Sequence, residues 1–566
     1  MALTDPVKLF EQAPVAVTPL GAGGVLVDFG RVAFGNLCLR PCDGATGTVT
    51  LHFGEAFAHG RINRNPPGSV RYARVDVDLA GGQTVVVAPP ADERNTGHPA
   101  AVKTPNEWGV VLPFRWVEVE AWPGEFQPAC ITRRAAFASS WDDEAASFAS
   151  SEPLLDRIWE LCRYSIKATT FAGVYVDGDR ERIAYEADAY LNQLSHYACD
   201  LGVQMARDTF DRLLAFPTWP SEWALHMIFM AYADWMQTGD RVWLAARYER
   251  LQPKLLLERA RADGLLVSTA AHREKGDLVD WPEGERDGFV FTSVNTVLNA
   301  FHVRALMQMS ELASALGKDE DAWAYANRAS AAGQALRDKL FDPARGLYRD
   351  GEGTDHTSLH ANLFPLAFGL VPRAARPSVA AWLAARGMAC SVYAAQYLLE
   401  GLFQHGFARE ALALMIAPGD RSWRHMVESG TTITWEAWDQ AYKPNQDWTH
   451  AWGAAPANLL PRFVLGAQPL TPGWTHLRLC PQPGHLTWAE GKIPTPRGPV
   501  AVRWESGPPF RLNVTLPPGL PARVEVPALA GSLGVWVDGR RIAARCVGGQ
   551  WVFEHDQAGA ACIEVR

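Results

Sequence analysis

The stretch SEPLLDRIWELCRYSIKATTFAG, Ser151 to Gly173, is where the pattern of the sequence changes from short strands to helices. Its apolar residues recur at intervals of three and four, the spacing of one stripe along a helix. Ser151 is placed to cap this helix by accepting hydrogen bonds from its first turn. The stretch therefore predicts the first helix of a helical region. The residues of the stripe are Leu154, Leu155, Ile158, Leu161 and Cys162.

Helical patterns continue for some three hundred residues beyond this point. Several are followed by loops rich in Gly, Pro, Trp and acidic residues, such as FPTWPSEW (216–223) and KGDLVDWPEGERDGF (275–289). Helices that alternate with such loops favour a barrel of paired helices, in which the loops at one end build the site. We expect this all-α domain to cover residues 149–464. Its further helices are predicted over 187–215, 222–237, 240–262, 292–316, 320–340, 358–370, 376–386, 392–404, 408–416 and 450–460.

Both flanks of the helical region have the pattern of antiparallel strands. GTVTLHFGEAF (47–57), ARVDVDLAGGQTVVVAPP (73–90) and FRWVEVEAW (114–122) alternate with period two, and LAGGQ is a candidate hairpin turn. HLRLCPQP, VAVRWESG, FRLNVTLPPG, ARVEVPAL and CIEVR repeat this pattern near the C-terminus. These runs predict one β-sandwich over residues 1–148 and a second over residues 465–566.

Length and composition limit the number of domains, the partners and the cellular location that we expect. A chain of 566 residues is long enough for two to four domains. The net charge of −9, without any basic run, argues against a nucleic-acid partner. The first residues lack the pattern of a signal peptide and no apolar run reaches a membrane span, so we expect a cytoplasmic protein without a membrane partner. A periplasmic location stays open if a leader has been removed. The nine cysteines lack CxxC spacing, which favours reduced thiols.

The stretch VYVDGDRERIAYEADAY, 174–190, concentrates charge between apolar segments. Glu181, Tyr185 and Asp188 are spaced by four and three residues, so on a helix they would share a face. The cluster is either an ion-paired helix start at the surface or the lining of a polar pocket. Neighbouring carboxylates would raise the pKa of an acid in such a pocket, whereas the arginines would lower it. The charged residues are Asp177, Asp179, Arg180, Glu181, Arg182, Glu186 and Asp188.

A second acidic cluster lies in ESGTTITWEAWDQAYKPNQDWTHAWG, 428–453. Glu436 lies between Trp435 and Trp438, and His450 follows among further tryptophans. Aromatic rings can pack against a sugar, and an apolar wall raises the pKa of an adjacent acid, so the pattern is compatible with a glycosidase. The alternative is a tryptophan-rich core segment.

A third cluster, DLVDWPEGERDGF, contains Asp277, Asp280 and Trp281. The DxDxDG spacing of a calcium loop is missing, so we expect no metal here. The loop is either solvated or in contact with a substrate. The chain also lacks a glycine-rich phosphate loop, GxSxG and HExxH.

With these clusters in view, the chain resembles the α-L-rhamnosidases of glycoside hydrolase family 78. That family has a motif of Asp, a short polar spacer, and then Glu-Arg-x-Gly-Trp-x-Gly-Asp. Asp177, the Glu181–Arg182 pair and Asp188 match it, with a shorter spacer and with Tyr185 in place of the Trp. Alanines replace the two glycines.

The second motif of the family, Thr-Thr-x-Trp-Glu-x-Trp-Asp, is matched by TTITWEAWD with one extra residue, and WTHAWGA follows it. LVDWPE resembles a Gly-Asp-Trp loop of the family, and two strand-rich stretches resemble its preceding sandwich. The resemblance covers about residues 45–480 in order.

The resemblance implies a multidomain fold with a central (α/α)6 barrel between two antiparallel β-sandwiches. It implies an inverting hydrolysis of terminal α-L-rhamnosides or related glycosides, with Glu181 as the general acid and Glu436 as the general base. The mechanism needs no metal or other cofactor. The expected partner is the carbohydrate substrate, whose predicted contacts are Asp177, Arg182, Tyr185, Asp188, Asp280, Trp281, Trp435, Trp438 and His450.

Two alternatives stay open at this point. The first is another (α/α)6 enzyme, either an inverting glycosidase or a polysaccharide lyase, in which Tyr185 or His450 would serve as the base. The second is a sugar-binding protein without catalysis. Two separated acids at Glu181 and Glu436 argue against a pure binder, because binding alone does not require them.

Overall fold

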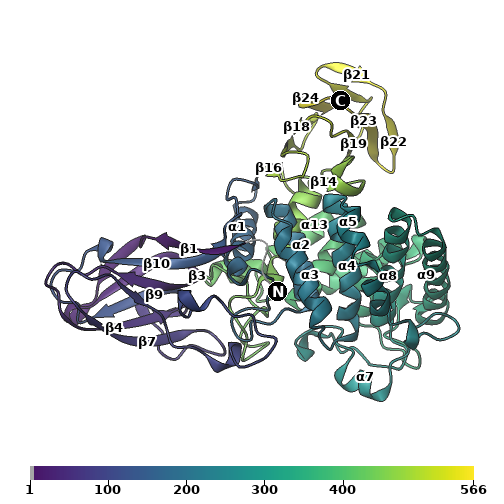
Figure 1. Cartoon of the computed structure of the whole chain (residues 1–566). Coiled ribbons are helices and arrows are strands. Elements are labelled where there is room, and N and C mark those ends of the chain that lie inside the picture. Colours follow the sequence, from purple (N-terminus) through teal and green to yellow (C-terminus); the bar gives the residue numbers. More distant parts are fainter. Residues whose placement is uncertain (1–5) are drawn as a thin grey trace.

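The computed structural model describes residues 6–566 and arranges them in three regions (Figure 1). A β-rich N-terminal region lies beside a central helical region, and a second β-rich region contains the C-terminus. This order of β-rich, helical and β-rich regions confirms the coarse prediction from the sequence. Within the described part of the chain, no helix is both long enough and apolar enough to span a membrane.

The N-terminal region is one eight-stranded antiparallel sheet that curls, which corrects the expected sandwich of two sheets. The long strand β3 (Val25–Leu39) pairs with β2 (Ala16–Pro19) near one end and with β8 (Val85–Val87) near the other. Its register against β9 shifts between Asp28 and Ala33. Such a bulge bends a strand, which lets one strand serve both parts of a curled sheet. The strand order is β1 (Val7–Gln12), β10 (Ile131–Ala138), β3, β9 (Leu112–Glu120), β4 (Gly47–Gly54) and β7 (Tyr72–Leu79).

The LAGGQ segment turns the chain but does not form the expected hairpin. β7 before it pairs with β4, whereas β8 after it pairs with β3. The turn therefore moves the chain from one edge of the sheet toward its centre.

The helical region consists of helices that pack mainly against their near neighbours in sequence. α2 packs against α4, α4 against α8, α8 against α9, and α10 against α12. The main helices are α1 (Pro153–Ala168), α2 (Glu186–Cys199), α3 (Gln204–Ala215), α4 (Ser221–Thr238), α8 (Thr296–Ala315), α9 (Asp319–Leu340), α10 (His360–Ala367), α11 (Arg376–Arg386), α12 (Val392–Gln404) and α13 (Ala408–Met415).

Three of the expected helices differ from the structure. The helix predicted over 187–215 is divided into α2 and α3, because Asp200 ends α2 and its carboxylate accepts from the backbone of Gly202. The segment 240–262 contains only two short helices, α5 (Arg241–Ala245) and α6 (Tyr248–Leu251), followed by 3-10 turns. The helix predicted over 450–460 is reduced to α15 (Ala455–Leu459).

The N-terminal cap of α1 is Glu152 instead of Ser151. The Glu152 side chain accepts from the Leu154 amide, whereas the Ser151 hydroxyl accepts from the amide of Thr487 in the C-terminal region. The expected cap therefore ties two regions of the chain together.

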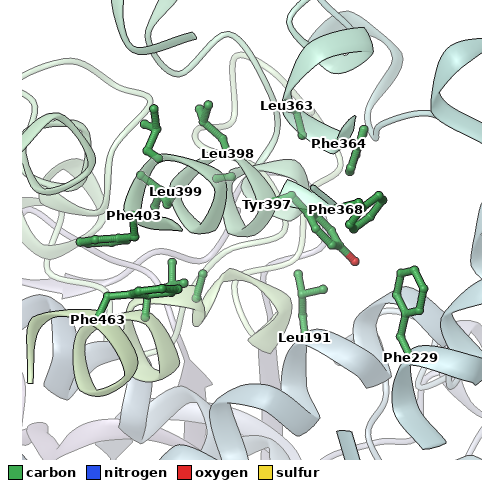
Figure 2. Packing of buried hydrophobic residues seen from close by; sticks show 14 of the residues in the cluster. Leu191, Phe229, Leu363, Phe364, Phe368, Tyr397, Leu398, Leu399, Phe403 and Phe463 are labelled. Atoms are coloured by element: carbon green, nitrogen blue, oxygen red, sulfur yellow. The ribbon is translucent and has the colours of Figure 1, made fainter. Parts of the chain in front are cut away.

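Aromatic and aliphatic side chains pack between helices of the helical region (Figure 2). Phe229 of α4 and Tyr397 of α12 point into a cluster that Phe364 and Phe368 complete. Phe403 stacks on Phe463 with ring centroids 4.9 Å apart, which joins α12 to the last helical segment. Burial of these rings supplies the main driving force for helix packing.

The C-terminal region contains two sheets. In the first, strand β11 (Ser147–Ser150), which precedes the helical region, pairs antiparallel with β16 (Trp488–Ile493), which follows it. The sheet therefore holds both ends of the helical region. Its order continues through β17 (Val500–Glu505), β18 (Phe510–Leu516), β24 (Gly559–Val565), β20 (Val535–Val537) and β21 (Arg540–Ile542). The second sheet has the order β14 (Ala467–Pro469), β15 (Leu477–Leu479), β19 (Ala522–Pro527), β23 (Gln550–His555) and β22 (Arg545–Val547).

Candidate active site

A cavity of about 230 Å³ brings together stretches that are far apart in the sequence. The two acidic clusters 174–190 and 428–453 both contribute to its wall, and segments around residues 219 and 281 contribute aromatic rings. Seven of the predicted site residues line this cavity, which is called the catalytic cavity below because the two acids predicted to be catalytic line it. They are Asp177, Glu181, Tyr185, Asp188, Trp281, Glu436 and His450, joined by Arg180, Trp219, Trp223, Leu278 and Trp452.

The segment between Asp177 and Ile183 is a closed loop that carries Glu181. The Asp177 amide donates to the Ile183 carbonyl oxygen (2.8 Å), and the Ile183 amide donates to Asp177 Oδ1 (2.9 Å). These two bonds hold the ends of the loop together, so the side chain of Glu181 projects outward and is 38% exposed. The loop thus presents one acid to solvent and to the cavity.

Glu181, Tyr185 and Asp188 share the cavity but do not share a helix face, which corrects the expectation from their spacing. Helix α2 begins only at Glu186, and Tyr185 before it has an extended backbone (φ −123°, ψ 144°). Arg182 has a positive φ of 55°, which turns the chain before the helix can start. The three residues meet through a bend followed by a helix start.

Gly178 and Asp447 bring the two acidic clusters into direct contact. The carboxylate of Asp447 accepts from the amide of Arg180 (2.7 Å) and from the amide of Thr449 (2.7 Å). A Cβ at Gly178 would lie 2.8 Å from Asp447 Oδ2, and its φ is 141°, so only glycine fits beside the carboxylate. This close approach fixes the position of Glu181 relative to the second cluster.

Buried ion pairs around Asp179 hold the acid loop against the N-terminal sheet region. The Asp179 carboxylate pairs with Arg71 and, at 2.6 Å, with Arg182. Arg182 also donates to the Val111 carbonyl oxygen (2.8 Å) and is 4% exposed. It therefore does not line the catalytic cavity. The predicted substrate contact at Arg182 is corrected to a contact that anchors the loop.

Glu436 is a buried carboxylate in a cationic setting. Arg180 donates to it through Nη1 (2.6 Å) and Nη2 (3.0 Å), and Lys443 Nζ lies 3.4 Å away. The amide of Asp447 donates to it as well (3.0 Å). Burial by itself raises the pKa of Glu436, but the hydrogen bonds and charges around it outweigh burial and lower the pKa to about 2. Glu436 is therefore ionised at neutral pH.

Arg180 touches both candidate catalytic acids, with unequal contacts. Its Nε lies 3.5 Å from Glu181 Oε1, whereas both of its terminal nitrogens are committed to Glu436. The hydroxyl of Tyr185 donates to the other oxygen of Glu181 (3.0 Å). Burial and the nearby carboxylates raise the pKa of Tyr185, so this hydroxyl keeps its proton. Glu181 is thus the less strongly paired of the two acids.

Asp177 and Asp188 supply further polar atoms to the cavity. Burial, reinforced by the charge of Glu181, raises the pKa of Asp177 well above its usual value, which favours the protonated acid. Asp188 Oδ1 lies within hydrogen-bonding distance, 2.7 Å, of His450 Nε2. The His450 ring also lies 4.7 Å from that of Trp452. The wall therefore contains both hydrogen-bonding groups and aromatic rings.

Asp280 orients the loop that carries Trp281. Its carboxylate contacts His360 Nε2 (2.6 Å), accepts from the Ser391 amide (2.9 Å) and accepts from the Trp281 amide (2.8 Å). Asp280 is fully buried and does not line the catalytic cavity, so the predicted sugar contact is corrected to a positioning contact. Trp281 itself lines the cavity, and Lys443 Nζ lies 5.2 Å from the centre of its ring.

Glu222 at the start of α4 holds the same loop through hydrogen bonds to its backbone. It accepts from the amides of Leu278 (3.0 Å) and Val279 (3.3 Å). Burial, together with the charge of Asp277, raises the pKa of Glu222 to about 7. The loop therefore rests on an acid that loses its proton in the neutral range.

Trp435 and Trp438 do not reach the catalytic cavity, which corrects their predicted role. Trp438 is fully buried, and its Nε1 donates to the Cys390 carbonyl oxygen (2.7 Å). Trp435 stacks on Trp448 with centroids 5.4 Å apart and faces a different cavity. Trp438 therefore lies in the core, as expected if this segment is a tryptophan-rich part of the core.

Several cavity residues were not among the predicted site residues. Trp219 and Trp223 lie in FPTWPSEW, a loop whose composition already indicated a site, so the signal was present. Trp452 lies in the second acidic cluster. Arg180 was recognised as a charge but not as the partner of Glu436. Lys443 does not line the cavity itself, and it carries no signal in the sequence because its contact with Glu436 forms only in the fold.

Comparison with known proteins identifies the family of this site. Residues 143–464 match the sequence model of the bacterial alpha-L-rhamnosidase 6 hairpin glycosidase domain. Residues 19–137 match the concanavalin-like domain of bacterial alpha-L-rhamnosidases, and residues 466–541 match their C-terminal domain. Because the first match alone covers more than half of the chain, the chain belongs to the bacterial alpha-L-rhamnosidase six-hairpin glycosidase family.

Two curated relatives are alpha-L-rhamnosidases. The protein of Alteromonas sp. (strain LOR) is 25% identical in an alignment of 453 positions that covers 73% of this chain and 48% of the relative. The protein of Streptomyces avermitilis is 23% identical in an alignment of 571 positions that covers 92% of this chain and 50% of the relative. This chain thus spans about half the length of the curated relatives it matches.

Solved structures share the fold. An alpha-L-rhamnosidase from Dictyoglumus thermophilum has a TM-score of 0.81 at 17% identity, over 100% of this chain and 64% of that chain. The Streptomyces avermitilis enzyme, solved in complex with L-rhamnose, has a TM-score of 0.79 at 20% identity, over 100% of this chain and 54% of that chain. At these identities the similarity to the solved structures shows the fold alone.

Proposed function

We propose that this chain is an exo-acting glycoside hydrolase that removes terminal α-L-rhamnose, or a close relative of it, with inversion. Glu181 is the general acid and Glu436 is the general base. The observation that carries the proposal is that these two acids, 255 positions apart, face one small cavity and contact the same guanidinium of Arg180. Membership of the rhamnosidase family supports the choice of sugar.

The proposed roles follow from the difference between the two acids. Glu436 is ionised at neutral pH, as a base that activates water must be. Glu181 is more exposed and more weakly paired, so it is the acid that a glycosidic oxygen can reach. An inverting pair leaves roughly 6.5–9.5 Å between the carboxyl groups for a water molecule. A single guanidinium lying between Glu181 and Glu436 is compatible with such a gap.

The dimensions of the cavity support removal of one terminal sugar. A volume of about 230 Å³ corresponds to roughly seven or eight water molecules of bulk liquid, which suits one sugar ring and a reacting water. Trp281, Trp223 and Trp452 offer apolar faces, while Asp177 and Asp188 offer polar atoms for hydroxyl groups. A longer chain would extend outward past Glu181, where the cavity meets solvent.

We also propose that the helical region closes into an (α/α)6 barrel and that the two C-terminal sheets pack as a sandwich. The pairwise packing of neighbouring helices supports the first proposal. The strict alternation of buried and exposed residues in β18 supports the second, because one face of this strand must be covered.

The protonation of Tyr185 argues against a polysaccharide lyase that uses this residue as its base. A lyase base must lose its proton near neutral pH, but the raised pKa of Tyr185 keeps its hydroxyl protonated. The hydroxyl of Tyr185 also donates to Glu181, so it is not placed to abstract a proton from a substrate carbon.

Substitution of each acid tests the proposal. We expect Glu181→Gln and Glu436→Gln each to lower kcat for 4-nitrophenyl α-L-rhamnoside by at least about a thousandfold, because each removes a proton-transfer group. Thermal unfolding of both variants checks that the fold is kept. Full activity in both variants would refute the assignment. NMR of the first product anomer distinguishes inversion from retention, and a panel of rhamnosyl, mannosyl, lyxosyl, arabinosyl and fucosyl aryl glycosides identifies the sugar.

A further inference from the structure

A second cavity, of about 500 Å³, lies between the N-terminal sheet region and the helical region. Its walls come from both regions, and none of the residues lining it lines the catalytic cavity. Trp435 borders this interdomain cavity, whereas the next residue, Glu436, borders the catalytic cavity. The stretch that begins at residue 435 therefore separates two spaces. A volume of this size is within the range of small-molecule sites.

Aromatic rings from two regions line the interdomain cavity. Phe57 stacks on Trp116 with centroids 4.5 Å apart, and Trp448 stacks on Trp435. Phe57 is 41% exposed, so part of its ring is accessible. Flat apolar rings beside an open space suit a ligand whose own ring has an apolar face.

Polar atoms beside these rings are suited to hydroxyl groups. Arg115 donates to Asp28 through Nε and Nη2, which leaves the two N–H groups of Nη1 for a ligand. The hydroxyl protons of Ser429 and Thr431 are used on backbone carbonyl oxygens, so their oxygen lone pairs are left as acceptors. The cavity thus offers both donors and acceptors beside apolar rings.

The number of carboxyl groups in the interdomain cavity indicates whether it could hydrolyse a sugar or only bind one. Glu55 is the only carboxyl group among the residues that line it. Burial and the charge of Asp447 raise the pKa of Glu55 well above its usual value, which favours its uncharged form. Glycoside hydrolysis requires two carboxyl groups on opposite sides of the bond. The interdomain cavity has the features of a binding site and lacks those of a hydrolytic one.

We infer that the interdomain cavity is a second, non-catalytic carbohydrate site that binds one neutral pyranose residue between Phe57 and the Trp435–Trp448 pair. A pyranose ring presents C–H groups on its faces and hydroxyl groups at its edge, which matches aromatic rings flanked by Arg115, Ser429 and Thr431. The choice of a sugar as the occupant rests on the proposed function. The site itself is independent of the catalytic acids, so the two ideas can fail separately.

The test uses the full chain with Glu436→Gln, so that no probe is hydrolysed. Isothermal titration with L-rhamnose and with α-L-rhamnopyranosyl-(1→6)-D-glucose is expected to show two binding events for at least one probe. Adding Phe57→Ala and Trp116→Ala should weaken one event by about tenfold or more and leave the other unchanged. Phe57→Ala alone, at an exposed position, serves if the double variant is unstable. Trp323→Ala, an exposed tryptophan on α9, is the matched control and should change neither event.

The possible results separate the inference from the proposed function. A single binding event with both probes, or two events that persist in the Phe57 and Trp116 variants, would overturn the second site. Saturation of the cavity by 4-nitrophenol, with no response to either sugar, would also overturn it. Loss of an event in these variants supports the site even if the wild-type chain fails to cleave 4-nitrophenyl α-L-rhamnoside, a result that would count only against the proposed function.

Discussion

Arg180 forms hydrogen bonds to Glu436 with both terminal nitrogens, and this contact fixes the charge of the proposed base. Arg180→Met removes the cation, so the pKa of Glu436 should rise by about 1–3 units. Because the base must be ionised, the acid limb of the pH profile of kcat/KM should move to higher pH. Steady-state rates with an aryl rhamnoside between pH 3 and 8 measure this shift.

A matched control for Arg180 is Arg247→Met, which breaks a similar ion pair with Asp211 outside the catalytic cavity. It should leave the acid limb unchanged. An acid limb that stays in place in Arg180→Met would mean that Glu436 does not control activity at low pH. The proposed assignment of the base would then be wrong.

The raised pKa of Glu222 predicts a pH dependence of stability. The protonated acid is favoured in the folded chain, so its contribution to stability is complete below about pH 4.5 and is lost as the pH rises to about 7. Glu222→Gln cannot lose this proton. We expect the Tm of the variant minus the Tm of the wild type to increase between pH 4.5 and 7 and to stay constant above pH 7.

The amide of Glu222→Gln loses the longer of the two backbone bonds, which lowers Tm by an amount that does not depend on pH. Only the pH dependence of the difference in Tm between Glu222→Gln and wild type therefore reports the titration of Glu222. Glu249→Gln, at an exposed side chain, should run parallel to the wild type throughout. A difference between Glu222→Gln and wild type that is constant from pH 4.5 to 8 would contradict the expected titration.

Residue types in the two acidic clusters predicted the chemistry of the site better than they predicted individual contacts. Glu181, Glu436 and His450 carry signals of type and spacing, and they line one cavity. Arg182 is adjacent to Glu181 in the sequence, but its positive φ sends its side chain to Asp179. Such a change of direction depends on the backbone, which a list of residue types does not specify.

At the scale of elements, Trp438 tests the distinction between core and site. Trp438→Phe removes the bond to the Cys390 carbonyl oxygen and leaves a void beside Trp423. We expect the free energy of unfolding to fall by about 2–4 kcal/mol, while kcat/KM changes by less than about threefold. Urea unfolding and steady-state kinetics measure the two quantities. Trp281→Phe, in the catalytic cavity, should show the opposite pattern, and a large loss of kcat/KM in Trp438→Phe would restore its predicted role.

Long apolar stripes predicted helices well, and loops with polar and aromatic residues did not. α4, α8, α9 and α12 lie close to their expected ranges, because each buries a wide apolar face. The segment 240–262 has a helical pattern, but Pro253 and the left-handed Leu256 (φ 55°) interrupt it. Local breaks of this kind outweigh the periodicity around them.

At the scale of the whole molecule, the pairing of β11 with β16 predicts that the C-terminal region is needed by the helices. A chain that ends at residue 464 leaves β11 without a partner, and the Val464 carbonyl oxygen loses the bond from Trp504. We expect this shorter chain to have a lower Tm and to associate through the open edge. Calorimetry and size-exclusion chromatography beside the full chain measure both effects. A monomer with an unchanged Tm would contradict this expectation.

The order of the three regions was predictable from the sequence, whereas the contacts between them were not. The change of periodicity near residue 150 and again near residue 466 is visible in the sequence. The pairing of β11 with a strand more than three hundred residues later, and the ion pair of Arg71 with Asp179, join segments whose distance in sequence carries no pattern. The curl of the N-terminal sheet likewise depends on a bulge within a single strand.

The pairing of β11 with β16 also determines how the molecule responds to tension. Ser147 lies opposite Lys492, so the two chain segments that lead to the rest of the N-terminal and C-terminal regions leave this strand pair at the same end. A pull on these two chain segments would therefore open the hydrogen bonds between β11 and β16 one after another. The helical region leaves this pair at the other end, beyond Ser150 and Ala489, so a pull transmitted along the two strands reaches the helices only after these bonds have opened.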